Sequence, residues 1–194
     1  MAKRLKEFYA KDRKIWRAWL KKNHAGAENV WLIIYKKVSG TPSVYYHDAV
    51  EEALCFGWID SVANKRDNKS FFLFFSNRKP KSGWSKVNKN RIEKLSKLKL
   101  MTTAGLAKIE AAKKDGSWNA LDAIEELVMP ADLKKQFAGN KKALKHFEVF
   151  PPSVKKGIFH WVESAKRDET RSKRIGETVS LAEKNIRANQ WKPS

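Results

Sequence analysis

The β-strand signal of this chain is confined to residues 30–77, which limits the fold to one small sheet. The run VWLIIYKK at 30–37 is rich in β-branched and aromatic residues. It is too apolar on both faces for a water-exposed edge strand, so it predicts a central strand of the sheet. Two alternating runs, 57–65 and 70–77, are joined by the polar turn 66–69 and predict an antiparallel hairpin. We therefore expect three strands in one antiparallel sheet.

Helical spacing of apolar residues dominates the rest of the chain, and Pro, Gly, Asn and Ser mark the helix ends. The helices predicted in this way span about 6–22, 46–56, 86–97, 103–114, 130–137, 140–149, 153–164 and 169–188. The fold class is therefore α+β, with a small three-stranded antiparallel sheet packed by helices and an all-helical C-terminal part. We expect an α+β domain at 1–120 and a helical part at 121–194 that packs on it.

The charge balance favours anionic partners. The 194 residues hold 41 Lys and Arg against 21 Asp and Glu, a formal net charge of +20 at pH 7. Such a positive field favours nucleic acid, anionic lipid or acidic proteins but says nothing about fold or specificity. The single cysteine, Cys55, excludes an intramolecular disulfide and a cysteine-based metal cluster. This cysteine usage predicts a cytoplasmic location, and because no apolar run is long enough to cross a membrane, we expect no transmembrane segment.

Sequence motifs do not define a reaction. The chain lacks the G-x-S-x-G elbow, the G-x-x-x-x-G-K-[S/T] phosphate loop and the G-x-G-x-x-G dinucleotide turn. The four histidines are widely spaced, and His47 with Asp48 and Glu51 is the nearest approach to a metal site. An acidic helix face with one histidine is usually just solvated. We therefore expect no metal, no cofactor and no catalytic residue set.

The strongest functional candidate is the segment RKPKSGWS at 78–85, which brings three cations, two hydroxyls and an indole to the predicted start of a helix. Helix N-termini attract anions, and a guanidinium can hold two anion oxygens at once. In the alternative interpretation, Arg78 pairs with Asp60 and Ser85 only caps the helix, while the indole packs in the core. The residues that we expect to contact an anion are Arg78, Lys79, Lys81, Ser82, Trp84, Ser85 and Arg91.

Asp60 supports a rival hypothesis. It follows Trp58 on the same face of a strand and is placed to face Arg78. If burial raises its pKa, the Asp60 carboxylate can act as a general base. Alternatively, it can hold the Arg78 guanidinium in a bidentate ion pair, and we favour this structural role. The rival hypothesis is a small enzyme that acts on an anionic metabolite in a pocket between Trp58, Asp60 and Trp84.

Nucleic acid is a second possible ligand class. The lysines of the predicted helix 86–97 can meet several phosphates with low specificity. Phe72 and Phe74 point to one side of their strand and Phe71 and Phe75 to the other, so at least one pair belongs to the core of a sheet covered by helices. Only the remaining pair could stack on bases.

Several strings resemble a known family. EEALCFGWIDS at 51–61, RKPKSGWS at 78–85 and VWLIIYKK at 30–37 resemble the YdeI/OmpD-associated family of bacterial proteins, and WVESAKR at 161–167 resembles its bacteriocin-protection element. The resemblance spans nearly the whole chain. It implies a role in envelope stress or bacteriocin protection but no reaction. We therefore expect a non-enzymatic binding protein that contacts an anionic ligand, nucleic acid or an acidic partner protein through its basic helix entrance.

Overall fold

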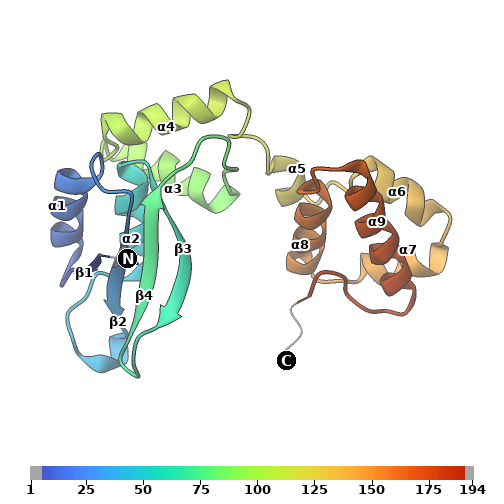
Figure 1. Ribbon diagram of the computed structural model, residues 1–194, viewed down its shortest axis with the longest axis horizontal. Coiled ribbons are helices and arrows are strands. Elements are labelled where there is room, and N and C mark those ends of the chain that lie inside the picture. The colour runs from blue at the N-terminus through green and yellow to red at the C-terminus, as the bar shows by residue number, and fades with distance from the viewer. Residues whose placement is uncertain (1–5, 191–194) are drawn as a thin grey trace, which may run out of the picture. The chain divides into compact units, whose positions relative to one another are not determined.

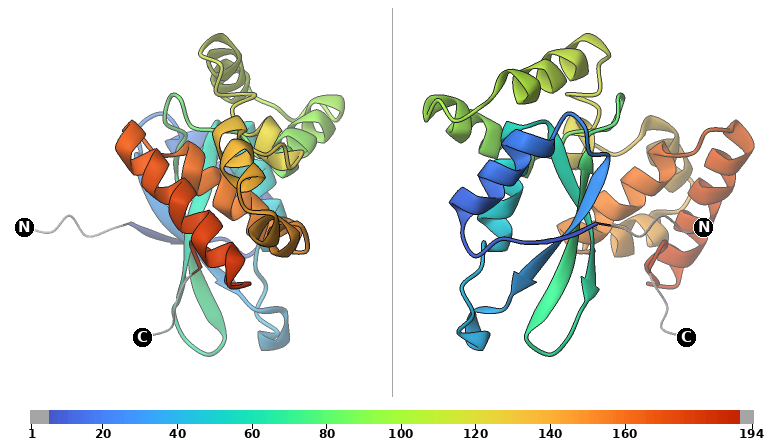
Figure 2. Two further views of the ribbon diagram at one scale, coloured as in Figure 1. Left: turned by 90° about the vertical axis from the view of Figure 1, so that its right-hand side faces the viewer. Right: turned by 60° about the vertical axis from the view of Figure 1, so that its left-hand side comes forward.

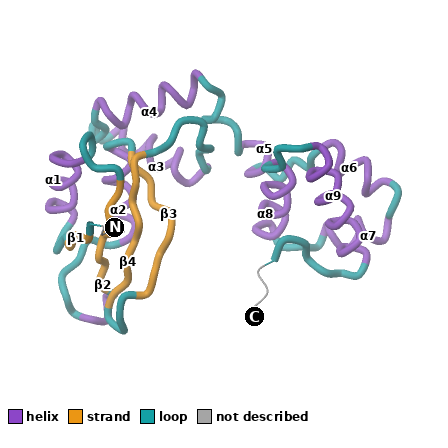
Figure 3. The backbone as a smooth tube through the Cα atoms, viewed as in Figure 1, coloured by secondary structure: helices purple, strands orange, loops and turns teal. Residues whose placement is uncertain are grey.

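The computed structural model describes residues 6–190, which form two compact units, one up to Ala120 and one from Leu121 (Figure 1). We call them unit 1 and unit 2. Unit 1 contains the strands with helices α1 to α4, and unit 2 is helical (Figure 3). Within residues 6–190, no helix is both long and apolar enough to cross a membrane.

Unit 1 is built on a sheet with the strand order β1-β2-β4-β3. β1 (Glu7–Tyr9) runs parallel to β2 (Asn29–Tyr35), and β4 (Ser70–Asn77) is antiparallel to both β2 and β3 (Trp58–Lys65). The central strand and the hairpin are confirmed. The prediction of a three-stranded, wholly antiparallel sheet is wrong, because the described residues form four strands in a mixed sheet.

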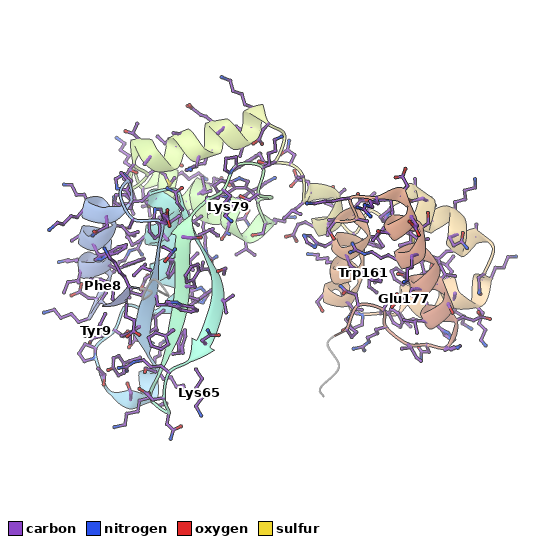
Figure 4. The ribbon with its side chains drawn as sticks, in the orientation of Figure 1. Phe8, Tyr9, Lys65, Lys79, Trp161 and Glu177 are labelled. Carbon is purple, nitrogen blue, oxygen red and sulfur yellow. The ribbon has the colours of Figure 1, made fainter. Side chains whose placement is uncertain are left out.

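The missed strand lies where the sequence predicted a helix from 6 to 22. That helix begins later, as α1 (Arg13–Asn23), because the Asp12 carboxylate accepts the N–H of Ile15 at 2.9 Å and caps the helix there. Phe8 lies in the short β1 instead and reaches the core from the sheet (Figure 4). A strand of three residues is too short to show a periodic pattern in the sequence. This segment is a strand because it pairs with β2.

The remaining helices of unit 1 agree with the sequence to within one residue. Two of them begin at side-chain caps, because Ser85 accepts the N–H of Asn88 and Thr102 accepts the N–H of Gly105. A short 3-10 turn that the sequence did not predict follows β2. These elements are α2 (Tyr46–Cys55), η1 (Lys37–Ser39), α3 (Lys86–Lys97) and α4 (Thr103–Lys114).

One face of the sheet carries the core of unit 1. Alternate residues of β2, namely Val30, Leu32 and Ile34, are buried with side chains from α1 and α2, and Leu73 and Phe75 continue this face on β4. Both helices lie together on one side of the strands (Figure 2). The intervening residues of β2 are partly exposed. The alternation of burial along β2 therefore corresponds to two different faces of the sheet.

Ion pairs join α1 to α2. Arg13 reaches Asp48 and Glu51 at 3.0 Å and Glu52 at 2.5 Å, and Arg17 reaches Glu52 at 2.5 Å. The acidic face of α2 is not simply solvated, because Glu51 and Glu52 are buried by these partners. Burial raises the pKa of Glu51, but hydrogen bonds from a lysine and an arginine outweigh burial and lower the pKa overall.

Within the described residues, no cluster of His, Cys, Asp and Glu could hold a metal ion.

Gly105 allows α4 to approach the end of α2. A Cβ atom at this position would lie 2.3 Å from the carbonyl oxygen of Cys55 and 2.9 Å from that of Leu54. Thr102 fixes the same contact, because its N–H and its Oγ1 donate to the Cys55 carbonyl at 3.1 and 2.6 Å. This contact sets the position of α4 against the rest of unit 1.

Unit 2 is a small helical bundle with its own apolar core. It consists of α5 (Asp122–Glu125), α6 (Ala131–Ala138), α7 (Lys141–Glu148), α8 (Pro152–Glu163) and α9 (Asp168–Glu183). The sequence missed α5, which is a single turn, and extended α9 by five residues beyond its end. Arg171 of α9 reaches Asp132 and, at 3.0 Å, Glu163, so it joins three helices of this unit.

The contact at Gly105 gives the first prediction. We expect Gly105→Ala to lower the free energy of unfolding of unit 1 by about 1–3 kcal/mol, because the new methyl group must displace the backbone of α2 or α4. Urea unfolding followed by tryptophan fluorescence measures the change. Gly26→Ala is the control, since a Cβ there meets nothing within 4 Å. Equal stabilities of the two variants would contradict this account of the α2–α4 contact.

Candidate functional site

Arg78 is a buried arginine at the end of β4, with only 5% of its surface exposed. Its backbone N–H donates to the carbonyl of Gly57 at 3.0 Å, which fixes the residue beside the start of β3. The guanidinium carbon lies 3.6 Å from the ring centroid of Trp84, and Nη2 donates to the carbonyl of Gly83. The guanidinium is therefore held against an indole by a cation–π contact and one hydrogen bond.

Two nitrogens of this guanidinium, Nε and Nη1, are buried without a hydrogen-bond partner. Burial lowers the pKa of Arg78 to about 10, and the Asp60 carboxylate opposes this shift in part. Arg78 therefore keeps its positive charge at neutral pH. Because buried polar groups are nearly always hydrogen-bonded, a buried cation with two open donors identifies a place where an acceptor can bind.

A cavity of about 70 Å³ lies beside this guanidinium. The segment from Arg78 to Trp84 forms one side, and the C-terminal half of α4 with the turn after it forms the other. Its lining includes four cations, Arg78, Lys79, Lys81 and Lys108. Lys108 also donates from Nζ to the carbonyl of Arg78 at 3.0 Å, so α4 and the end of β4 are held together at this point.

Asp115 and Ser117 complete the lining after α4. Each carboxylate oxygen of Asp115 accepts a backbone N–H, one from Ser117 at 2.9 Å and one from Lys81 at 3.2 Å. The Ser117 hydroxyl lies near this carboxylate and lowers its pKa, yet it does not reach hydrogen-bond geometry and is buried without a partner. Ser117 thus adds a third unpartnered polar group to the cavity.

The structure brings together most of the residues that the sequence proposed around Arg78. Lys79 and Lys81 are exposed at the cavity, and Figure 4 marks Lys79 in the loop after β4. Ser82 donates from Oγ to the carbonyl of Lys79 at 2.7 Å, and Lys81 adopts a positive φ of 59°. These two features close the turn that presents both lysines.

Ser85 and Arg91 do not belong to this site. Ser85 caps α3, while Arg91 donates to the Asn88 side chain at 2.8 Å and lies 3.3 Å from Nδ1 of His47. Neither residue lines the cavity. The cations therefore do not gather at the N-terminus of α3 as the sequence suggested. The loop bends toward α4 instead, because the Lys81 N–H binds the carboxylate after that helix.

Trp58 and Asp60 also lie apart from the cavity lining. Trp58 is wholly buried and donates its indole N–H to the carbonyl of His24 at 3.1 Å, so it is a core residue. Asp60 accepts the hydroxyl of Tyr46 at 2.9 Å. Among the residues that the structure describes, no carboxylate lies within ion-pair distance of Arg78, so the Asp60–Arg78 pair that we favoured is not formed.

Lys108 and Ser117 are the site residues that the sequence did not reveal. They come from α4 and the turn after it, at least 30 residues after Arg78. The sequence marked this region only as the end of the predicted helix 103–114. No local pattern links it to the loop after β4, because the two meet only when α4 packs on α2.

Comparison with protein families assigns the two units separately. Residues 8–108 match the family model described as Domain of unknown function (DUF8412), which covers more than half of the chain. The chain belongs to this family. The matched segment includes Arg78, Trp84 and Lys108, whereas Asp115 and Ser117 lie beyond it.

Residues 126–185, within unit 2, match the model described as Bacteriocin-protection, YdeI or OmpD-Associated. The resemblance to that family is thus confirmed for part of the chain, and the expectation that it spans nearly the whole chain is corrected to this segment. No curated protein and no solved structure matches the chain.

A second prediction follows from the open donors of Arg78. In buffer free of oxyanions, we expect Arg78→Met to leave the free energy of unfolding of unit 1 unchanged or to raise it by about 1 kcal/mol or more, because an apolar side chain carries no desolvation penalty. Arg17→Met is the control, since Arg17 donates to Glu52 and to the Leu100 carbonyl. That variant should lose about 1–3 kcal/mol in the same urea titration. Equal losses in both variants would show that Arg78 has a structural role.

Proposed function

We propose that unit 1 binds an oxyanion, such as a phosphate, sulfate or carboxylate group, in the cavity beside Arg78. One observation carries the proposal: the Arg78 guanidinium is buried and charged, and two of its nitrogens have no acceptor. An anion oxygen supplies the missing acceptor and the missing counter-charge together. Hydrogen bonds between a guanidinium and an oxyanion are about twice as strong as those between neutral groups.

Charge and preorganisation support an anion rather than a neutral ligand. Four cations line the cavity against the single carboxylate of Asp115, whose two oxygens are already bonded to backbone N–H groups. The contact with Trp84 holds the guanidinium in place before a ligand arrives. A donor that is already ordered loses little conformational entropy on binding.

The size of the cavity limits the ligand. A volume of about 70 Å³ accommodates one small group, whereas pockets for whole drug-sized ligands measure about 300–1,000 Å³. The ligand is therefore a small free anion or the anionic end of a larger molecule that extends past Lys79 and Lys81. The Ser117 hydroxyl and the backbone N–H groups lower the pKa of Asp115, which disfavours this carboxyl as a proton donor, so we favour binding over catalysis.

The cellular role that we propose is tolerance of stress or of bacteriocins. The match of 126–185 to the Bacteriocin-protection, YdeI or OmpD-Associated model supports this part of the proposal. We also propose a cytoplasmic location, since the lone cysteine, Cys55, is buried and free, as is usual for thiols in reducing compartments.

Isothermal titration with inorganic phosphate and with sulfate, at constant ionic strength in chloride, tests the proposed function. We expect Arg78→Met to weaken the affinity at least about tenfold, because loss of a buried charged partner costs about 2–5 kcal/mol. Arg91→Met is the matched control, since Arg91 lies outside the cavity lining, and its affinity should stay within about twofold of the unchanged protein.

Two results would contradict the proposed function. One is an unchanged protein that binds neither anion. The other is an equal loss in both variants, which would assign binding to the general positive charge instead of the cavity.

A further inference from the structure

The face of the sheet that points away from α1 and α2 is aromatic. On a sheet face in water, alternate side chains are normally polar. Here most outward positions of the paired strands β2 and β4 hold large apolar side chains, four of them aromatic, and these apolar side chains are partly exposed. These residues, with Tyr9 of β1, are Trp31, Ile33, Tyr35, Phe72 and Phe74, and we call them the outer aromatic face.

The rings of this face lie side by side across strands. Trp31 lies 4.9 Å from Phe74 and 6.0 Å from Phe72, with interplanar angles of 62° and 67°, and Tyr9 meets Tyr35 at 5.5 Å and 82°. Rings that meet edge to face do not cover one another completely. Ring surface therefore stays available for an additional flat group.

One end of the sheet next to this face is strongly basic. The turn between β3 and β4 adjoins the end of β2, because the Lys36 N–H donates to the Lys69 carbonyl at 2.9 Å. Arg66 connects this end to the aromatic face, since its guanidinium carbon lies 5.9 Å from the Phe72 ring centroid. Five exposed cations gather here against the single carboxylate of Asp67, and Figure 4 marks one of them, Lys65. They are Lys36, Lys37, Lys65, Arg66 and Lys69.

We propose that the outer aromatic face binds single-stranded nucleic acid, with bases on the rings and phosphates at the basic end. Exposed rings beside a row of cations meet both needs of such a ligand, because every base has a flat surface and every nucleotide carries a charge. A duplex hides its base surfaces within its own stack, so it can use only the cations. Exposed aromatic rings on a four-stranded sheet can stack about two or three bases.

This site is independent of the oxyanion cavity. Phe72 and Phe74 lie within β4 and the five cations lie at 36–37 and 65–69, whereas the cavity begins at Arg78 and involves α4. The structure also revises the possibility of base stacking considered from sequence. Phe75 is fully buried and Phe71 packs on the core, so the pair left for bases is Phe72 and Phe74, joined by Trp31 of the neighbouring strand.

Fluorescence anisotropy with a labelled ten-nucleotide oligothymidylate tests the proposal. We expect Phe72→Leu with Phe74→Leu to weaken binding about fivefold or more, because leucine keeps the apolar bulk but gives no stacking surface. Phe71→Leu is the matched control on the opposite face of the same strand and should bind as the unchanged protein does. Arg78→Met should also bind normally, which separates this site from the oxyanion cavity.

A second pair of changes tests the basic end without altering the aromatic face. Lys65→Gln with Lys69→Gln replaces two exposed side chains and leaves Arg66 in place over the Phe72 ring, so circular dichroism should be unchanged. The slope of log affinity against log salt should become shallower by about 1.4, since each lost phosphate contact on a single strand contributes about 0.7.

Three results would overturn the proposal. One is equal binding of the oligonucleotide by the Phe72→Leu, Phe74→Leu protein and the Phe71→Leu control. Another is a blunt duplex that binds as tightly as the single strand. The third is displacement of the oligonucleotide by polyglutamate at equal charge, which would assign the face to an acidic protein.

Discussion

The contact between the Arg78 guanidinium and the Trp84 ring is the interaction on which the proposed oxyanion site depends. It holds a positive charge inside the protein and leaves two of its donors without acceptors. Folding alone does not favour this arrangement, because an apolar side chain could fill the same space without a desolvation penalty. The cavity also depends on the position of α4. This helix lies close to α2 because Gly105 has no Cβ, and its Lys108 donates a hydrogen bond to the backbone carbonyl of Arg78.

Two separate places in unit 1 gather positive charge in different ways. At the cavity, one cation is buried and three lie in the remaining lining, which suits a single compact anion. At the end of the sheet, five exposed cations adjoin a row of rings, which suits an extended polyanion with flat groups. The two kinds of binding that we propose therefore differ in the burial of the cations and in the neighbouring aromatic residues.

Local sequence signals predicted the elements of unit 1 well but not the way in which they meet. The β-branched and aromatic run gave β2, alternation gave the hairpin, and Ser85 marked the start of α3. The three-residue β1 could not be predicted, because only its pairing with β2 makes it a strand. The same holds for unit 2, where the one-turn α5 was missed and longer helices were found.

The candidate site was predicted in part for the same reason. Arg78, Lys79, Lys81 and Trp84 are close in sequence, so their cluster was visible, whereas Lys108 and Ser117 join it only through the packing of α4. Ser85 and Arg91 were assigned to the site because a helix start seemed the natural anion site, yet the loop binds the carboxylate after α4 instead. The alternation of Phe71 to Phe75 separated two faces correctly, but only the position of α1 and α2 decided which face is core.

The most direct test of this account is a crystal structure of the protein grown with selenate and measured at the selenium absorption edge. The account predicts an anomalous peak within hydrogen-bond reach of Nε or Nη1 of Arg78 and close to the Ser117 hydroxyl. Selenate peaks elsewhere with none at this position, and both nitrogens bonded to protein oxygens, would contradict it.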